Sequence, residues 1–445
     1  MSDKKEEIYF GPNVWLIDEM YRQYLEKPDS VADSWRDFFM DYKPGILTSE
    51  VTEKEEKVDT QPEKQDMGLE VELLRGFAAR IVENMESSLT VPTATSTRVV
   101  PVKVLEENRR IINQHLSSTH GGKLSFTHII AWAILVSLKK TPALTMAYME
   151  IDGKPHKIRQ KHINFGLAID VERKDGSRSL LVPNIKESET LDFKSFFAAY
   201  NDMIRKVKSN KIEPDDFMGT TASLTNPGTI GTVHSVPRLM PGQSCIVATG
   251  AIDYPMEYQS ADPQIIARLG ISKIMTMTCT YDHRVIQGAE SGLFLQYIHR
   301  LLSGEENFYD DIFKSLSIPQ RALKLKRDIN PLFESDGQGK AMFDKQAEVL
   351  RLINMARVRG HLIADINPLN QDVRTHSELD PEKYGLSIWD YDRVFNTQGL
   401  AGHTYLTLRE ILDILRDSYF RSIGVEYMHI QEPDQKKWID RKSVV

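Results

Sequence analysis

Long apolar runs, paired cysteines and dense basic blocks are all missing from this sequence, and each absence excludes a class of protein. No stretch of eighteen consecutive apolar residues occurs, so the sequence predicts no membrane-spanning helix. The two cysteines, Cys245 and Cys279, form no C-x-x-C pair and lie in apolar runs, so we interpret them as core thiols and expect neither a disulfide framework nor a zinc site. No block of five Lys or Arg residues occurs and the formal net charge is -7, so a nucleic-acid partner is not expected.

A secretory pattern is also missing from the first residues. MSDKKEEIYFGP begins acidic and polar, where a signal peptide needs a basic region followed by an apolar one. We therefore expect a cytoplasmic protein. Its 445 residues, of which 41% are hydrophobic and 27% charged, suffice for two or three units, each with its own core.

Residues 1–44 predict a small helical hairpin, because apolar residues recur at helical spacing on both sides of Pro28. These residues are Leu16, Ile17, Met20, Tyr21, Tyr24, Val31, Trp35, Phe38 and Phe39. Such a short piece cannot bury two aromatic faces alone, so it packs on the body of its own chain or docks on a partner, and both interpretations stay open. Residues 45–70 predict an acidic linker, since positions 46–70 hold eight acids and three lysines.

The middle of the chain alternates between helix and strand patterns. Helices are expected over 69–85, 104–116 and 193–207, and the nearly all-apolar stretch LSFTHIIAWAILVSLKKTP predicts a buried helix. Strand-like runs are HINFGLAIDVE, LLVPNIK, GTTASLTNPGTIGT, SCIVATGAI and KIMTMTCTYDH. In the last run Met275, Met277, Cys279 and Tyr281 share one face. This mixed order predicts an α+β sandwich on a largely antiparallel or mixed sheet.

The last part of the chain is helical and polar. Apolar residues at helical spacing follow a capping box made by Thr407 and Glu410. We found no glycine-rich phosphate loop, no metal-spaced His/Cys cluster and no nucleophile elbow in this region. We interpret its helices as ordinary scaffold.

A histidine between an acid and a base, in TYDHRVIQGAES, is the main candidate for chemistry. His283 follows an alternating strand and precedes a glycine that begins a helical pattern, a place where side chains meet substrates. An imidazole with a pKa of about 6.5 is a suitable base for a thiol of pKa about 8.5. A lone histidine is more often structural, and His128, His162 and His361 receive that interpretation.

Resemblance to a known family strengthens the catalytic interpretation. YDHRVIQGA resembles the D-H-R-x-x-D-G signature of the acyltransferase component of 2-oxo acid dehydrogenase complexes. TASLTNPGTIGT and GQSCIVATGAI resemble two further strand segments of that family, and the similarity covers about residues 87–305. GPNVWLIDEMYRQYLEKPDSVADSWRDFF and KQAEVLRLINMARVRGHLIADINPL through GVEYMHI resemble the thiamine-dependent decarboxylase of a fused, multifunctional 2-oxoglutarate dehydrogenase.

This resemblance implies a chloramphenicol-acetyltransferase-like sandwich that forms a trimeric core with active sites between neighbouring subunits. His283 would be the general base that takes the proton of the attacking thiol. Thr225 would donate a hydrogen bond to the oxyanion, next to the supporting residue Asn226. Asp282 and Arg284 would orient the loop by a charge pair. Without the resemblance, Thr225 would be interpreted as a strand-end residue bonded to its own turn.

Gln287 departs from the family pattern, which has Asp at this position. Glutamine keeps hydrogen-bonding capacity and loses the charge, so the rigidity of the loop is the property in question, more than proton transfer. The fused subtype also carries glutamine here, and we interpret Gln287 as a mark of that subtype.

The implied domains are a decarboxylase N-terminal helical peptide (1–44), the acidic linker (45–70), the acyltransferase catalytic domain (71–312), a connector (313–344) and a truncated first helical domain of the decarboxylase (345–445). Coenzyme A and a lipoyl group would be substrates. We found no lipoyl-bearing segment, so the resemblance implies a lipoyl-bearing acyltransferase of a sister complex as a partner, together with dihydrolipoamide dehydrogenase. We found no G-D-G stretch either, which would leave thiamine diphosphate and magnesium to a missing part of the decarboxylase.

Succinyl transfer in the citric acid cycle is therefore the expected function, as part of a 2-oxoglutarate dehydrogenase oxidoreductase system. The alternative is a trimeric scaffold that keeps the acyltransferase fold for docking only. A thiamine-dependent activity of this chain alone is disfavoured by the absent cofactor loop. Loss of His283 would separate the first two, since a scaffold tolerates it and an enzyme does not.

Overall fold

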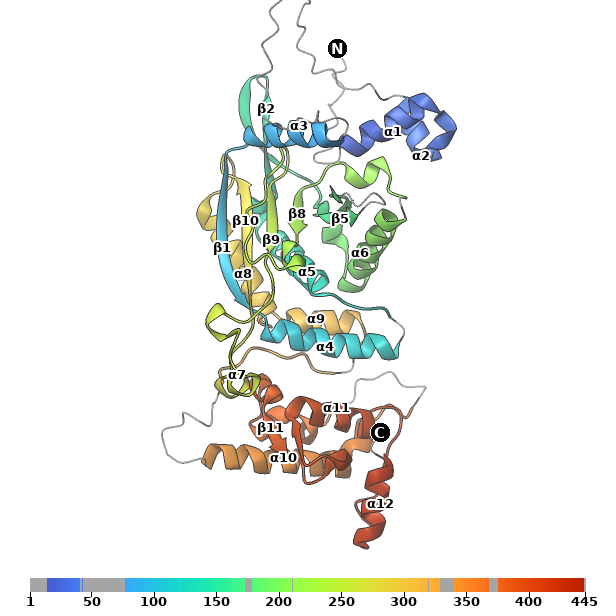
Figure 1. Ribbon diagram of the computed structural model, residues 1–445, viewed down its shortest axis with the longest axis vertical. Helices are drawn as coiled ribbons and strands as arrows, with labels where there is room; N and C mark the ends of the chain where they lie inside the picture. The colour runs from blue at the N-terminus through green and yellow to red at the C-terminus, as the bar shows by residue number, and fades with distance from the viewer. Residues whose placement is uncertain are drawn as a thin grey trace, which may run out of the picture.

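The computed structural model describes residues 14–40, 42, 77–119, 121–172, 178–209, 211–318, 320–328, 340–367 and 375–443. The predicted linker lies outside these residues, as does the start of the helix expected from Leu69. The described chain forms a helical hairpin, a central sheet unit and a C-terminal helical unit, arranged one after another along the long axis (Figure 1). Buried apolar side chains form three clusters: one mainly in the central unit, one in the C-terminal unit, and one shared by the hairpin and the central unit.

A mixed six-stranded sheet forms the centre, in the order β1-β10-β9-β8-β4-β7. Its strands are β1 (Thr93–Pro101), β4 (Phe165–Leu167), β7 (Asn184–Ile185), β8 (Ala222–Thr225), β9 (Cys245–Thr249) and β10 (Ile274–Asp282). β8 pairs in parallel with β4 and β9, and the other neighbours are antiparallel. The expected α+β class with a mixed sheet is confirmed.

Helices cover one face of this sheet, because the apolar side chains of the strands lie on that face and form a common core with the helices. α5 (Phe126–Lys140) and α8 (Gly288–Leu302) lie behind the sheet in Figure 1. α5 is apolar nearly all round and is buried as predicted, with Ser125 capping its first turn. The alternating face of β10 points into the same core, where Cys245 and Cys279 are both buried and free. The unit also contains α3 (Phe77–Leu89), α4 (Lys103–Ser118), α6 (Phe193–Lys208), α7 (Pro263–Leu269) and α9 (Phe308–Ser315).

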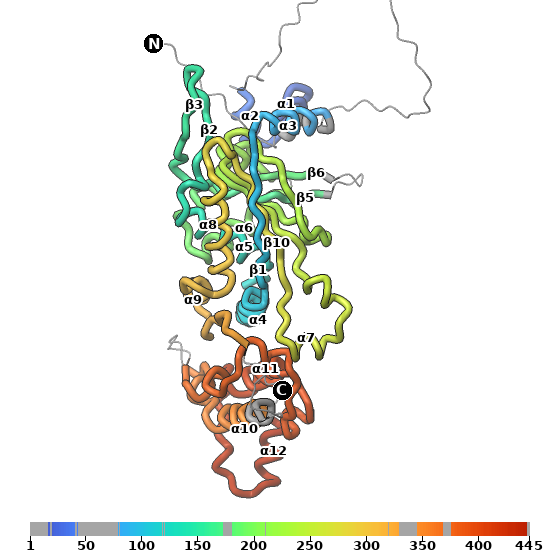
Figure 2. The backbone as a smooth tube through the Cα atoms, turned by 90° about the vertical axis from the view of Figure 1, so that its left-hand side faces the viewer, coloured from blue at the N-terminus to red at the C-terminus, as the bar shows by residue number. Residues whose placement is uncertain are grey.

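A β-hairpin that the sequence analysis did not identify stands beside the start of α8 (Figure 2). β2 (Met146–Ile151) and β3 (Lys154–Arg159) pair antiparallel along their full length. Asp152 and Gly153 join them with φ of 52° and 71°. Two successive left-handed residues make the two-residue turn whose twist suits a hairpin. A second short pair is formed by β5 (Ile169–Glu172) and β6 (Arg178–Leu181).

The N-terminal hairpin, α1 (Val14–Glu26) and α2 (Asp33–Met40), packs on the body of its own chain. Its buried residues Ile17, Trp35 and Phe39 join a cluster with side chains of the central unit, among them Met203 and Phe217. The Trp35 indole also donates a hydrogen bond of 3.1 Å to the carbonyl oxygen of residue 212. Of the two open interpretations of this segment, packing on its own chain is the one that the structure shows.

The C-terminal unit contains α10 (Lys340–Arg359), α11 (Leu408–Tyr419), α12 (Pro433–Ser443) and the short pair β11 (Val394–Asn396) and β12 (Tyr405–Thr407). It meets the central unit along α4 through charged side chains. Arg409 binds both carboxylate oxygens of Glu107, whose side chain is 1% exposed. Lys103 contacts Asp392 at 2.5 Å, and Arg110 contacts an oxygen of residue 413 at 2.6 Å. This network fixes the C-terminal unit against α4.

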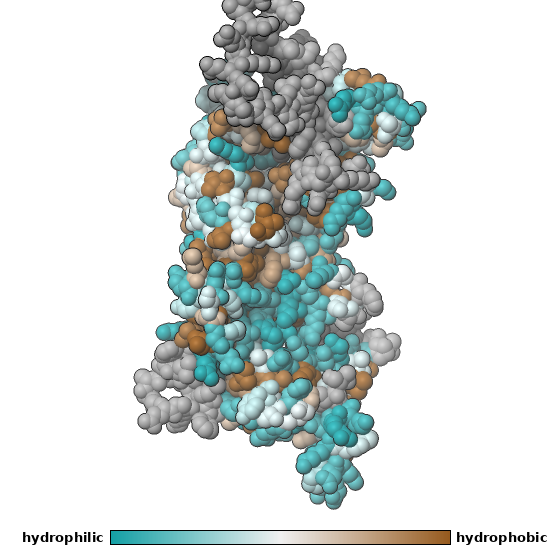
Figure 3. Space-filling model, viewed as in Figure 1, coloured by the Kyte–Doolittle hydropathy of each residue, from teal (hydrophilic) through white to brown (hydrophobic). Residues whose placement is uncertain are grey.

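Apolar side chains gather in patches on the face of the central unit that Figure 3 shows. Large apolar residues exposed in this unit include Val99, Ile230, Val233 and Val236. Contiguous exposed apolar surface is typical of a contact with another molecule. Within the described ranges, no helix is both long and apolar enough to cross a membrane.

Candidate active site

His283 lies in the five-residue connection between the end of β10 and the start of α8. Its backbone N–H donates to the carbonyl oxygen of Pro92 at 2.9 Å. Two apolar residues of the connection, Val285 and Ile286, are buried in the central core and anchor it. The histidine itself stays exposed on the surface of this chain.

A backbone carbonyl orients the His283 imidazole. Nδ1 lies 3.0 Å from the oxygen of Ile286, which can only accept, so Nδ1 carries the hydrogen. The lone pair is then on Nε2, the nitrogen available to take a proton. The ring also meets Tyr281 edge-on, with centroids 5.7 Å apart.

The expected charge pair between Asp282 and Arg284 is present. The Arg284 guanidinium donates to Asp282 through Nε at 2.9 Å and Nη2 at 2.7 Å, and the Arg284 backbone N–H donates to the same carboxylate at 3.0 Å. The hydrogen bond to Asp282 raises the pKa of Arg284 above its ordinary value. The Asp282 carboxylate is thereby tied to the backbone immediately after His283.

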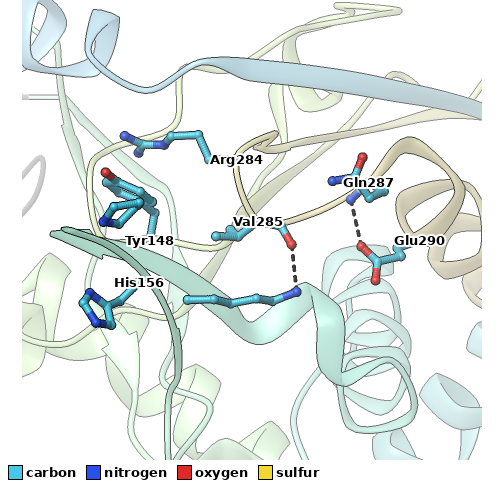
Figure 4. A pocket seen from close by; sticks show the side chains of 8 residues that line it. Tyr148, His156, Arg284, Val285, Gln287 and Glu290 are labelled. Atoms are coloured by element: carbon cyan, nitrogen blue, oxygen red, sulfur yellow. Dashed lines mark hydrogen bonds between the residues drawn. The ribbon is translucent and has the colours of Figure 1, made fainter.

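The other side of the connection borders an open pocket of about 750 Å³ (Figure 4). Its lining comes from β2, β3, the connection itself and the start of α8, and consists of Tyr148, Pro155, His156, Lys157, Arg284, Val285, Gln287 and Glu290. The Arg284 guanidinium stacks on Tyr148 at 3.7 Å from the ring centroid. Lys157 Nζ donates to the carbonyl oxygen of Val285 at 2.9 Å.

Gln287 is the N-cap residue of α8, and its backbone N–H donates to the Glu290 carboxylate at 2.7 Å. Sequence reasoning missed three of the residues that support this connection: Tyr148, Lys157 and Glu290. The Asp152–Gly153 turn could have indicated the hairpin that carries the first two. The Gln287-x-x-Glu290 spacing could have indicated the third as part of a capping box.

Thr225 is the last residue of β8, and Asn226 follows it. Asn226 is held by a hydrogen bond of 2.9 Å to the hydroxyl of Thr127, at the start of α5. The turn after Thr225 is closed by the hydroxyl of Thr229, which donates to the Asn226 carbonyl oxygen. Gly228 permits this turn to approach the backbone of residue 250, where a Cβ would lie 2.3 Å from a carbonyl carbon.

The structure does not bring Thr225 and His283 together within one chain. Thr225 is level with Ala248 and hence with Thr278 in the middle of β10, whereas His283 follows the C-terminal end of that strand, beyond the Tyr281 to Cys245 pair. Five residues of strand separate the two levels, roughly 16 Å along the sheet. A site that uses both residues therefore needs them from two copies of the chain.

Comparison with known protein families identifies two matches in this chain. Residues 68–309 match the 2-oxoacid dehydrogenases acyltransferase (catalytic domain), and residues 6–45 match the 2-oxoglutarate dehydrogenase N-terminus. The chain belongs to the 2-oxoacid dehydrogenase acyltransferase family. The resemblance to the acyltransferase family and the expected acyltransferase fold are confirmed. The catalytic domain of this family is an acyltransferase domain, so the chain carries an enzyme domain of that class.

Curated relatives extend over nearly the whole chain. A multifunctional 2-oxoglutarate metabolism enzyme of Mycolicibacterium vanbaalenii is 45% identical over 98% of this chain, and one of Mycobacterium sp. (strain JLS) is 42% identical over 97%. The chain spans 39% of the length of each of these two relatives.

Two solved structures align with about half of this chain. A dihydrolipoamide acetyltransferase of Azotobacter vinelandii is 21% identical, with a TM-score of 0.46, and the alignment covers 56% of this chain and 99% of that one. A probable dihydrolipoamide acetyltransferase of Listeria monocytogenes is also 21% identical, with a TM-score of 0.45 and coverage of 54% and 97%.

Within the described ranges, no group of three or more His, Cys, Asp or Glu side chains is placed so that it could hold a metal ion. The histidines predicted to be structural have protein partners. His162 binds Glu189 at 2.8 Å and His361 lies 3.2 Å from Glu426. His128 caps α5 and is buried, which lowers its pKa to about 4.

Proposed function

We propose that this chain transfers a succinyl group between a dihydrolipoyl thiol and coenzyme A, as part of a 2-oxoglutarate dehydrogenase system. The observation that carries the proposal is the orientation of His283, whose Nδ1 is engaged by the Ile286 carbonyl so that Nε2 is available as a base. Family membership supports acyl transfer, and the names of the curated relatives support 2-oxoglutarate metabolism as its setting.

The proposed site lies between two copies of the chain, with His283 from one and Thr225 from the next. Their separation along the strands of the sheet supports this arrangement. So do the exposed apolar residues Ile230, Val233 and Val236, which closely follow Thr225 and would be covered by a neighbouring copy. The assembly we propose is a trimer, as the family resemblance implies.

In the proposed reaction, Nε2 of His283 takes the proton of the attacking thiol as its sulfur bonds to the thioester carbonyl carbon. The negative charge moves to the carbonyl oxygen, which accepts a hydrogen bond from the Thr225 hydroxyl. The intermediate collapses, the second carbon–sulfur bond breaks, and the departing thiolate takes the proton back from the imidazolium. Proton transfer by a positioned base contributes about 10²- to 10⁴-fold.

The proposal includes the domain boundaries 1–44, 45–70, 71–312, 313–344 and 345–445. The lipoyl group comes from a separate lipoyl-bearing acyltransferase, and dihydrolipoamide dehydrogenase reoxidises it. No step with thiamine diphosphate or magnesium is assigned to residues of this chain.

The test is transfer of succinyl from succinyl-coenzyme A to free dihydrolipoamide by the intact chain and by His283→Ala. We expect kcat to fall by about 10²- to 10⁴-fold in the variant, with its oligomeric state unchanged. If the intact chain does not exceed the uncatalysed thiol exchange, or if His283→Ala is as active as the parent, the function proposed here is wrong and the scaffold alternative replaces it. Gln287→Asp then shows whether the missing charge is the reason.

A further inference from the structure

The peptide group between Ile286 and Gln287 is bonded at both of its polar ends. Its carbonyl oxygen accepts from His283 Nδ1 at 3.0 Å, and its N–H donates to the Glu290 carboxylate at 2.7 Å. A continuous chain of hydrogen bonds therefore runs from the carboxylate, through one peptide group, to the imidazole. A carboxylate at the N–H end polarises the peptide and strengthens the bond that its carbonyl accepts.

The preceding peptide group, between Val285 and Ile286, is also bonded at both ends. Its carbonyl oxygen accepts from Lys157 Nζ at 2.9 Å, and its N–H donates to the Asp282 carbonyl oxygen at 3.0 Å. Lys157 belongs to β3 and is brought to this point by the β2–β3 hairpin. The connection is thus held by opposite charges on two different elements, a distant one on Lys157 of β3 and a local one on Glu290 of α8, whose bond to Gln287 is drawn in Figure 4.

We propose that Glu290 and Lys157 are positioning residues for His283. Each fixes one of the two peptide groups beside Ile286, so that the carbonyl oxygen stays in line with Nδ1–H and Nε2 stays free to accept a proton. The inference rests on the proposed function. It also accounts for the uncharged side chain at Gln287. The carboxylate that holds the connection belongs to Glu290, three residues later, and it accepts a hydrogen bond from the backbone N–H of Gln287.

Glu290 also has a structural role that is independent of His283. Glu290 completes a capping box at the N-terminus of α8, and such a residue stabilises its helix wherever it occurs. The chain contains a matched control, because Glu410 makes the same bond to the backbone N–H of Thr407 at 2.8 Å. That box begins α11, in the C-terminal unit.

The first experiment measures kcat and KM for succinyl transfer in Glu290→Ala, Lys157→Met and Glu410→Ala. Loss of one charge-assisted hydrogen bond corresponds to about a tenfold change in rate. We therefore expect kcat to fall by about that factor in Glu290→Ala and in Lys157→Met, with the KM values for succinyl-coenzyme A and dihydrolipoamide unchanged. Glu410→Ala should lower Tm as Glu290→Ala does and keep kcat within about twofold of the parent.

Conservative variants sharpen this test. Lys157→Arg retains a cationic donor and should restore kcat, and Glu290→Gln retains an acceptor without the charge and should give an intermediate kcat. If Glu290→Ala and Lys157→Met keep the parental kcat while His283→Ala is inactive, the positioning role is wrong and the proposed function stands.

A second readout does not need activity. Nitrogen-15 spectra of the imidazole distinguish hydrogen on Nδ1 from hydrogen on Nε2. We expect His283 to be in the Nδ1–H tautomer in the parent and in Glu410→Ala, and in a mixture of the two in Glu290→Ala. A parent without succinyl transfer would overturn the proposed function alone, and these spectra would still decide the positioning role: an unchanged tautomer in Glu290→Ala overturns it.

Discussion

The central unit holds its two neighbours by different balances of contact: apolar burial dominates at the N-terminal hairpin, whereas ion pairs accompany the buried Ile388 at the C-terminal unit. The N-terminal hairpin is attached by an apolar cluster around Trp35 and Phe39, with one hydrogen bond from the indole. The C-terminal unit is attached along α4 by ion pairs, of which the one between Arg409 and Glu107 is the most buried at its acidic end. Arg393 adds a second contact by hydrogen bonding, because its guanidinium donates to the backbone carbonyl oxygens of residues 267 and 268 in α7.

The two kinds of contact constrain the neighbouring units differently: apolar burial attaches a unit, whereas a bidentate ion pair also fixes its orientation. Apolar burial is roughly proportional to area and has no direction, so the hairpin can shift slightly with little loss. The bidentate pair between Arg409 and Glu107 is favourable only in its own geometry, because the Glu107 carboxylate is buried and has lost its water. The hairpin is therefore bound to the central unit, whereas the C-terminal unit is bound and also aligned.

Trp35→Ala should have the largest effect on this comparison. Replacing a buried tryptophan by alanine costs about 3–5 kcal/mol, which is enough to release the hairpin from the central unit. Hydrogen exchange of residues 14–40 measures this release. Trp438 is a matched control because it is 57% exposed, and Trp438→Ala should change stability by less than about 0.5 kcal/mol. Equal protection of 14–40 in both variants would contradict the attachment through Trp35.

Glu107→Ala should have the next largest effect, on the other attachment. Breaking a buried pair costs about 3–5 kcal/mol, and we expect the lower end because Arg409 retains Asp392. Urea denaturation followed in the C-terminal unit measures the loss. Glu305→Ala is the control, since its pair with Arg300 is about half exposed and should contribute less than about 1 kcal/mol. Similar losses in the two variants would mean that the α4 network is not a fixed junction.

The smallest expected effect is a difference in pH dependence. Burial raises the pKa of Asp392, but attraction to Lys103 and Arg409 outweighs burial and the net pKa is lowered. A carboxylate with a lowered folded pKa stabilises the fold above its unfolded pKa of about 3.9, and this contribution is lost as the pH falls further. Acidification from pH 5 to pH 3 should therefore loosen the C-terminal junction more than the apolar hairpin contact. Hydrogen exchange of α11 measures this, and an undiminished pH response in Asp392→Asn would contradict it.

Patterns within single elements were enough to predict much of the fold. The alternation in β10 and the all-apolar run of α5 placed their side chains in the core correctly, because burial of one face, or of the whole surface, leaves a period in the sequence. The β2–β3 hairpin was missed for the complementary reason. Most of its side chains are exposed, so neither strand has a clear apolar face.

The candidate site was predicted in the same uneven way. His283, Asp282 and Arg284 are adjacent in sequence, and their motif identified them. Lys157 could not be found from the sequence, since it lies 128 residues from its partner Val285 and their contact depends on how the hairpin packs. Local sequence patterns do not show that Thr225 and His283 lie at different levels of the sheet either, because that depends on the strand register. Their catalytic roles stay predictions.

The separation of Thr225 from His283 has a genetic consequence. Suppose that each site takes His283 from one copy of the chain and Thr225 from the next. A variant without the histidine then still supplies an intact threonine, and a variant without the threonine still supplies an intact histidine. A cell that makes both chains would assemble some sites from the two intact halves. Two recessive alleles of one gene would then complement each other, as alleles of two different genes normally do.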